Sequence, residues 1–239
     1  QIQKKRSQEN LITEPMSFHM IFKGNPGTGK TTVARIMGRL FKKLGVLQKG
    51  HLIEVERGDI VGEYIGQTAQ KTKVQLKRAM GGILFIDEAY SLARGGEKDF
   101  GKEAIDTLVK SMEDFREQFV LILAGYHDEM DRFLLTNPGL RSRFPIKISF
   151  PNYSTNELLA IANLMLKERQ YNLSINAREE LRMILERESR EFRNSGNARL
   201  VRNIIERAIR RQAVRLLKEK EFSRNDLIKI TKEDLIHYC

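Results

Sequence analysis

Nine residues, GNPGTGKTT, run from Gly24 to Thr32 and fit the pattern G-x-x-x-x-G-K-T. In such a segment the glycines let backbone N–H groups turn inward around a β-phosphate, the Lys30 ammonium reaches β and γ oxygens, and the Thr31 hydroxyl holds Mg²⁺. A structural glycine turn is the alternative, but the segment stands between an apolar run and a helical pattern, which favours phosphate binding. The residues predicted to bind the nucleotide are Gly24, Asn25, Pro26, Gly27, Thr28, Gly29, Lys30, Thr31 and Thr32.

A second segment, GILFIDEA, places the carboxylates of Asp87 and Glu88 directly after an apolar run. A buried strand would deliver Asp87 at its carboxyl end to hold Mg²⁺ through water, while Glu88 could orient and deprotonate an attacking water. A strand followed by an acidic turn is common, but the phosphate-loop pattern upstream favours hydrolysis. The chain has no N-K-x-D segment of the kind that reads guanine, so ATP is favoured over GTP.

Apolar runs alternate with helical patterns as far as about residue 150. The predicted strands are 18–22, 52–56, 82–87, 119–125 and 146–150, and the predicted helices between them are 31–45, 68–81, 100–115 and 128–135. This alternation predicts an α/β fold with a parallel sheet covered by helices on both faces.

After Pro151 the strand signals stop and apolar residues recur at helical spacing. The predicted helices are 154–170, 177–192 and 197–219, and their predicted caps are Ser154 or Thr155 with Glu157, Asn176 with Glu179, and Asn197. We therefore predict two domains. Residues 1–151 form a large α/β nucleotide-binding domain, with 1–17 as a linker or helix ahead of the sheet, and residues 152–239 form a small helical domain.

The net charge of +11 raises an acidic partner such as nucleic acid. The charge is spread evenly, however, with 24 Lys and Arg against 18 Asp and Glu in residues 1–151 and 18 against 13 in residues 152–239. Solvated helix faces are therefore favoured over nucleic-acid binding. No window approaches the roughly 18 uninterrupted apolar residues of a membrane helix, so no membrane span is expected. The one cysteine, Cys239, fits a reducing, cytoplasmic location.

From Gly24 onward the sequence resembles the AAA+ ATPases. The resemblance rests on GNPGTGKT, LFIDEA, NPGLRSRF at 137–144 and SGNAR at 195–199, in the order that family uses. GEYIGQTAQKT, GGILFIDEAYSL and LILAGY are similar to the subgroup that holds stage V sporulation protein K and the red-type Rubisco activases, and LARGGEKDFGKEAIDTLVK is closest to its sporulation members. The resemblance implies a five-stranded parallel sheet and a small helical lid domain.

The resemblance also implies roles for two arginines. One arginine of NPGLRSRF would reach the γ-phosphate held by a neighbouring subunit and stabilise the charge of the transition state. By position this is Arg143, with Arg141 as the alternative. In SGNAR, Arg199 would point to the γ-phosphate of its own subunit, with Arg202 as the alternative.

The chain departs from the family in two places. Many members have an Asn after the fourth strand to position the attacking water, whereas this chain has Tyr126 and His127 there. The adenine-contacting segment is represented only by residues 1–17, so the contacts to the base stay unassigned.

The segment GEYIGQT, residues 62–68, resembles the pore loop of AAA+ rings that thread proteins. Its residues Tyr64, Ile65 and Gly66 would grip an extended polypeptide, and a buried tyrosine in a glycine loop is the structural alternative. The resemblance thus implies an ATP-hydrolysing ring, a hexamer, that remodels or threads a protein partner, with a role in sporulation. A nucleic-acid-acting AAA+ machine and a slowly hydrolysing assembly platform are the alternatives.

Overall fold

The chain divides into two compact units. The first unit is Gln1–Gly24 with Gly29–Phe150, and the second is Asn25–Thr28 with Pro151–Cys239. The structure, a computed structural model, describes residues 5–6, 9–12, 17–64, 66–95, 99–136, 138–191, 196–219 and 221–236. Ile65, Asn137, Ser195 and Cys239, which the sequence singled out, lie outside these residues.

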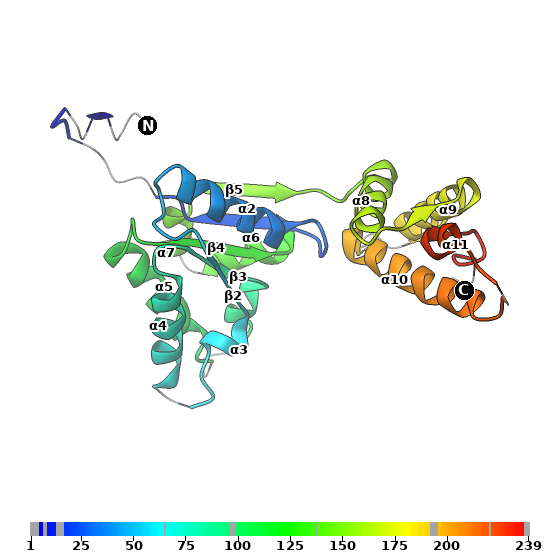
Figure 1. The fold of residues 1–239 in the computed structure, drawn as a ribbon. Helices are drawn as coiled ribbons and strands as arrows, with labels where there is room; N and C mark the ends of the chain where they lie inside the picture. The colour runs from blue at the N-terminus through cyan, green and yellow to red at the C-terminus, as the bar shows by residue number, and fades with distance from the viewer. Residues whose placement is uncertain are drawn as a thin grey trace. The chain divides into compact units, whose positions relative to one another are not determined.

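A five-stranded parallel sheet forms the centre of the first unit (Figure 1). Its strands are β1 (Met20–Gly24), β2 (Leu52–Val55), β3 (Ile83–Ile86), β4 (Val120–Gly125) and β5 (Ile146–Phe150), in the order β2-β3-β4-β1-β5. Every residue of β3 and β4 is buried, whereas buried and more exposed residues are mixed along the edge strands β2 and β5. Central strands of a parallel sheet are covered on both faces, which explains why their sequences are uniformly apolar.

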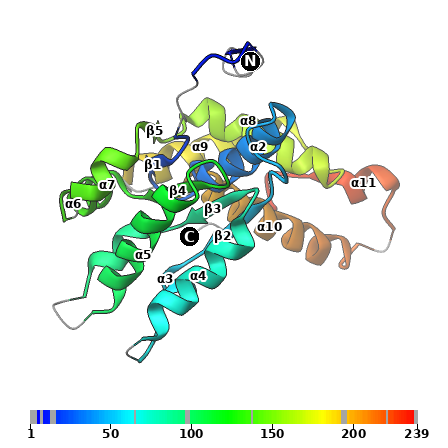
Figure 2. The ribbon, with the colours of Figure 1, turned by 90° about the vertical axis from the view of Figure 1, so that its left-hand side faces the viewer.

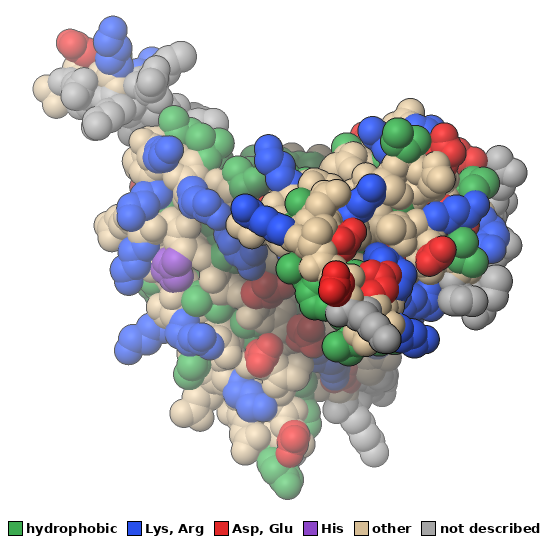
Figure 3. Space-filling view, turned by 45° about the vertical axis from the view of Figure 1, so that its right-hand side comes forward, with side chains coloured by type: hydrophobic (Ala, Val, Ile, Leu, Met, Phe, Trp, Pro, Cys, Tyr) green, Lys and Arg blue, Asp and Glu red, His purple; other side chains and the backbone are tan. Residues whose placement is uncertain are grey.

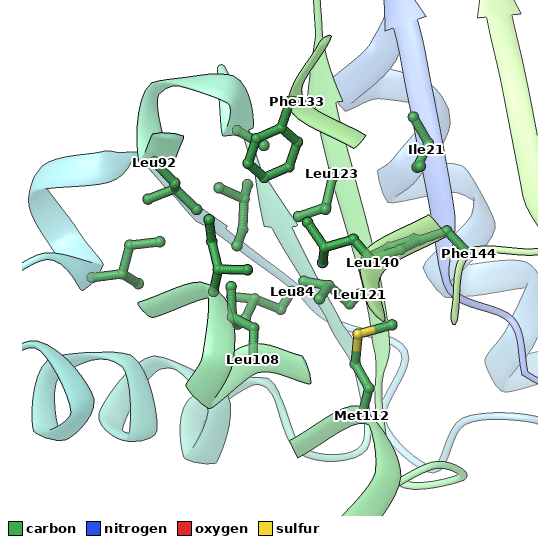
Figure 4. Close-up of a cluster of buried hydrophobic side chains, with 14 of the residues drawn as sticks. Ile21, Leu84, Leu92, Leu108, Met112, Leu121, Leu123, Phe133, Leu140 and Phe144 are labelled. Carbon is green, nitrogen blue, oxygen red and sulfur yellow. The ribbon is translucent and has the colours of Figure 1, made fainter. Parts of the chain in front are cut away.

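Helices cover both faces of this sheet. They are α2 (Lys30–Lys43), α3 (Arg57–Ile60), α4 (Gln67–Ala79), η1 (Ala89–Ala93), α5 (Gly101–Asp114), α6 (His127–Thr136) and α7 (Pro138–Arg143). Alternate strand residues enter two different apolar clusters, since Leu84 packs with α4, α5 and α6 (Figure 4), whereas Phe85 packs with α2. Figure 2 shows α4 and α5 side by side. A register slip of one residue would exchange the two faces, so the apolar pattern fixes the pairing.

The second unit is mainly helical. Its elements are α8 (Thr155–Glu168), β6 (Asn172–Leu173), α9 (Ile175–Glu191), α10 (Asn197–Leu216), α11 (Arg224–Ile228) and β7 (Lys229–Ile230). Apolar residues of α8, α9 and α10 form one buried cluster that Ile230 and Leu235 complete. Among the helices of the described residues, none is both long and apolar enough to span a membrane.

The helix caps agree with the sequence at one helix and differ at two. Ser154 caps α8 in a reciprocal pair with Glu157, as predicted. The cap predicted at Asn176 is wrong, because α9 begins at Ile175 and the Ser174 hydroxyl accepts the N–H of Ala177 at 3.1 Å. The cap at Asn197 is also wrong, because this residue is already the first of α10 and its side chain bonds elsewhere.

The predicted fold class is confirmed: a parallel five-stranded sheet flanked by helices precedes a helical unit. Each of the five strands and seven longer helices named from the sequence is present, with ends shifted by a few residues at most. The sequence did not predict the short elements α3, η1, α7, α11, β6 and β7. These elements have two to six residues, too few to establish a period.

We predict that a buried histidine makes the fold acid-sensitive. His19 is 2% exposed and its Nδ1 accepts the N–H of Leu121 at 3.0 Å. Burial lowers its pKa from 6.5 to about 4. The unfolded chain therefore binds more protons between these values, so stability is lost as the pH falls from about 6.5 toward 4.

The test is chemical denaturation of the wild type and of His19→Asn at pH 7 and pH 5. Asn keeps an acceptor but does not titrate. From pH 7 to pH 5 the wild type should lose about 2 kcal/mol more unfolding free energy than the variant. The other titrating groups are common to both proteins and cancel in this comparison. Equal losses would show that His19 is not responsible.

Candidate functional site

The phosphate-loop and acidic residues predicted in the first unit follow strands at one edge of the sheet, whereas Arg141 and Arg143 come just before β5, at the opposite, amino ends of the strands. β1 ends at Gly24, β3 ends immediately before Asp87, and β4 ends immediately before Tyr126. These strands are neighbours in parallel register, with Ile86 opposite Leu123 and Lys23 opposite Gly125. Their carboxyl ends therefore meet at the same edge, where open parallel sheets bind ligands.

The phosphate-loop segment leads directly into α2. Gly29 has a φ of 90° and stands at the amino end of α2, which has no side-chain cap and no acidic residue in its first turn. Gly27 has a φ of 73°. Successive N–H groups in such a turn, followed by a positive helix end, form a concavity that suits a phosphate. The Lys30 ammonium donates to the Gly24 carbonyl at 2.8 Å, which holds it across the loop.

Thr31 faces a carboxylate that the sequence did not indicate. Its hydroxyl donates to Glu54 Oε1 on β2 at 3.4 Å, and Arg35 lies 3.7 Å from the same carboxylate. Glu54 was missed because it lies in an ordinary strand pattern, and only the pairing of β2 with β3 places it near the site. Thr32, the last predicted nucleotide residue, is exposed.

Asp87 and Glu88 form a tight turn after β3. The backbone N–H of Glu88 donates to Asp87 Oδ1 at 3.0 Å, and Glu88 has a φ of 47°. Left-handed backbone is uncommon outside glycine and often occurs at functional sites. The buried residues Ala89, Tyr90 and Leu92 of η1 anchor the turn, while the Glu88 side chain is exposed.

The pKa of Tyr90 responds to burial and to the negative charge of the neighbouring Glu88. Burial, followed by the Glu88 carboxylate, raises the pKa of Tyr90 to about 12. The Arg94 guanidinium lies 4.6 Å from the centre of the Tyr90 ring, and the centres of the Tyr90 and Tyr126 rings lie 6.0 Å apart. Tyr126 is partly buried and packs against the core of the first unit. His127 is the exposed first residue of α6.

The two arginines at the end of the first unit differ in environment. Arg141 is exposed. Arg143 pairs with Glu113 of α5 and donates to the Gly139 carbonyl at 3.0 Å. The Glu113 partner lies 30 residues earlier on another helix, which no local pattern could indicate.

The second unit contains the first part of the phosphate loop, Asn25–Thr28, together with the start of α10. Ala198 donates its N–H to the Gly27 carbonyl at 3.1 Å, and the Asn197 amide donates to the Pro26 carbonyl at 3.2 Å. The Arg199 N–H bonds to the Gly196 carbonyl at 2.8 Å, and its side chain is exposed. Sequence reasoning singled out Arg199 but treated Asn197 only as a cap. Arg202, its alternative, is exposed.

The predicted pore loop connects α3 to α4. Tyr64 is 68% exposed, so it is not the buried tyrosine of the structural alternative. Two fully buried threonines of α4 hold the base of the loop. Thr68 Oγ1 accepts the N–H of Gly62 at 2.9 Å, and Thr72 Oγ1 donates to the Ile60 carbonyl at 3.1 Å.

Comparison with known proteins shows the family of the chain. The profile of the "ATPase family associated with various cellular activities (AAA)" matches residues 20–152, and that of the "AAA lid domain" matches residues 154–237. Stage V sporulation protein K of Bacillus subtilis is 57% identical over 237 residues, covering 98% of this chain and 73% of that protein. The chloroplastic ribulose bisphosphate carboxylase/oxygenase activase of Cyanidioschyzon merolae is 47% identical over 238 residues, covering 98% and 81%.

Solved structures agree in fold. The RuvB Holliday junction branch migration motor of Thermotoga maritima superposes with a TM-score of 0.63 at 20% identity, covering 97% of this chain. The chain spans 63% of the length of that RuvB chain. The two profile matches and the 57% identity to stage V sporulation protein K lead to the same family. The chain therefore belongs to the AAA ATPase family, with an AAA domain followed by an AAA lid domain, and is an ATP hydrolase.

Proposed function

We propose that the chain works as a ring, a hexamer, that uses ATP hydrolysis to remodel or thread a protein partner in the cytoplasm. The observation that carries the protein-threading part is the exposure of Tyr64, on a loop that buried threonines anchor to the same unit that holds Asp87 and Glu88. An exposed aromatic ring can pack against successive side chains of an extended polypeptide without reading its sequence.

In the proposed reaction, the N–H groups of residues 24–32 bind the phosphates, and Lys30 adds positive charge at the β and γ oxygens. Glu88 holds the attacking water and takes its proton. Arg199 neutralises charge on the γ-phosphate of its own subunit. Cleavage separates the γ-phosphate from ADP, and once this phosphate leaves, Lys30 and Arg199 face less negative charge, which gives the subunit two states.

Thr31 and Asp87 fit a magnesium ion. Both offer the oxygen ligands that Mg²⁺ prefers, and this ion usually keeps only one or two carboxylates together with phosphate oxygens and water. No group of three or more His, Cys, Asp or Glu side chains forms a metal cluster among the described residues. When bound, the ion would neutralise charge on the transferred phosphate.

Arg143 is proposed to act on the nucleotide of the neighbouring subunit. Within one subunit its guanidinium pairs with Glu113, and the two side chains are 28% and 55% exposed. A partly exposed pair of this kind contributes at most about 1 kcal/mol, so a neighbour's γ-phosphate can outcompete it. Arg141 is the alternative, because it is already exposed.

The identity of 57% to a sporulation protein supports a role in sporulation. The nucleic-acid alternative needs a continuous basic surface. On the face of the second unit drawn in Figure 3, basic and acidic side chains lie interspersed. This face of the second unit therefore offers no continuous basic surface.

Glu88→Gln should lower ATP turnover by about 10²- to 10⁴-fold and leave ATP binding intact, because Gln keeps the shape of the side chain but cannot accept the proton. Steady-state phosphate release and equilibrium nucleotide binding provide the measurement. Glu117→Gln, an exposed carboxylate after α5, is the matched control and should behave as wild type. Unchanged turnover in Glu88→Gln would contradict hydrolysis through this site.

Arg143→Ala should lower turnover about 10²-fold or more, whereas Arg141→Ala should change it little. If Arg143 acts between subunits, mixing Arg143→Ala with Glu88→Gln should restore part of the activity, because some interfaces then combine an intact Glu88 with an intact Arg143. Phosphate release of the mixture measures this. Mass measurement with an ATP analogue should show a ring. Only monomers, or no recovery on mixing, would count against the shared site.

Tyr64→Ala should keep assembly and basal ATP turnover but lose the stimulation of turnover by an unfolded polypeptide such as casein. Tyr64→Phe, which keeps the ring and removes only the hydroxyl, should retain that stimulation. Loss of assembly in Tyr64→Ala would instead assign the residue to subunit contacts and rule out the pore role.

A further inference from the structure

Three consecutive carbonyl groups of the phosphate loop accept hydrogen bonds within the second unit. The Pro26 carbonyl accepts from Asn197 Nδ2 at 3.2 Å, the Gly27 carbonyl from the Ala198 N–H at 3.1 Å, and the Thr28 carbonyl from the Tyr153 hydroxyl at 3.0 Å. In a planar trans peptide the C=O and the following N–H point in opposite directions. Because these carbonyls point toward Tyr153 and the start of α10, the N–H groups of residues 27, 28 and 29 point to the opposite side of the loop. This is the orientation in which they can donate to a phosphate.

Asn197 is built into this arrangement. It is fully buried and has a φ of 47°. Its Oδ1 accepts the N–H of Tyr153 at 3.0 Å, and its Nδ2 also donates to Asn152 Oδ1 at 3.1 Å. Asn152 Oδ1 in turn accepts from Asn25 Nδ2 at 2.9 Å. A buried amide whose oxygen and nitrogen are both bonded holds its neighbours in one arrangement, because any shift leaves a buried polar atom unpaired.

The backbone packing at Gly27 restricts the loop further. A Cβ on Gly27 would lie 2.3 Å from the Gly196 carbonyl oxygen and 3.0 Å from the Arg199 nitrogen. The loop and the start of α10 therefore touch backbone to backbone. A glycine with positive φ permits this approach, and any larger residue would separate the two segments.

We propose that Tyr153 and Asn197 are positioning residues for ATP: they hold residues 26–28 with the carbonyls turned away from the phosphate, so that the N–H groups are oriented before the nucleotide arrives. This inference rests on the proposed phosphate site. Neither residue was predicted to contact the loop, and neither is placed in contact with ATP. Their contribution is preorganisation, which raises affinity by reducing the ordering that binding requires.

The test compares Tyr153→Phe, which removes one hydroxyl, with Asn197→Gly, which removes the amide and tolerates the left-handed backbone. Tyr171→Phe is the matched control, because Tyr153 and Tyr171 both pack against the apolar cluster of the second unit. The probe is a fluorescent ATP analogue, titrated against the full chain with Mg²⁺. ATP turnover supplies KM and kcat separately, and thermal unfolding checks the fold.

Tyr153→Phe should raise the Kd for the analogue and the KM for ATP about three- to tenfold, the effect of one lost hydrogen bond. Asn197→Gly, which loses three hydrogen bonds, should raise both constants at least as much. In both variants kcat should stay within about twofold of wild type. Tyr171→Phe should match wild type. Should Asn197→Gly fail to fold, Tyr153→Phe decides alone.

A Lys30→Ala variant separates this inference from the proposed site. If Lys30→Ala loses the analogue while Tyr153→Phe and Asn197→Gly bind it as wild type does, the positioning role is overturned and the site stands. If Lys30→Ala binds as wild type does, the phosphate site is overturned, and the inference with it. A fall in kcat at unchanged KM would also overturn the positioning role.

Discussion

Parallel pairing of β1, β3 and β4 is the constraint on which the candidate site depends. In a parallel sheet all strands end on the same edge, so three segments that lie far apart in the sequence deliver Gly24, Asp87 and Tyr126 to one place. The pairing is itself fixed by burial, because alternate residues of each central strand enter the two opposite apolar clusters. The position of the candidate site therefore depends on apolar strand residues that take no part in the proposed reaction.

Much of the fold could be predicted because its signals are local. Central strands such as β4 are continuous apolar runs, and α10 repeats its apolar period over 20 residues. The phosphate loop and the Asp87 turn could also be found, since each is a contiguous motif. The short elements could not be predicted because they have too few residues to show a periodic apolar pattern. The cap of α9 was misplaced because Ser174 and Asn176, only two residues apart, are both good caps.

The partners of the site residues could not be predicted, because sequence distance hides them. Glu54 beside Thr31, Glu113 beside Arg143, and Tyr153 beside Thr28 lie 23, 30 and 125 residues away in the chain. None belongs to a motif. Each is brought into contact by the packing of whole elements, so the motifs supply the proposed reacting groups and the tertiary fold supplies the side chains that contact them.

The backbone at Glu88 is unfavourable for folding, in contrast with the catalytic role proposed for this residue. A φ of 47° disfavours a side chain with a Cβ by about 1–2 kcal/mol, and glycine or asparagine would adopt it more readily. Selection for folding alone would thus replace Glu88. That a glutamate occupies this position means that the molecule is locally less stable than its own backbone would allow, and the neighbouring buried side chains of η1 must compensate.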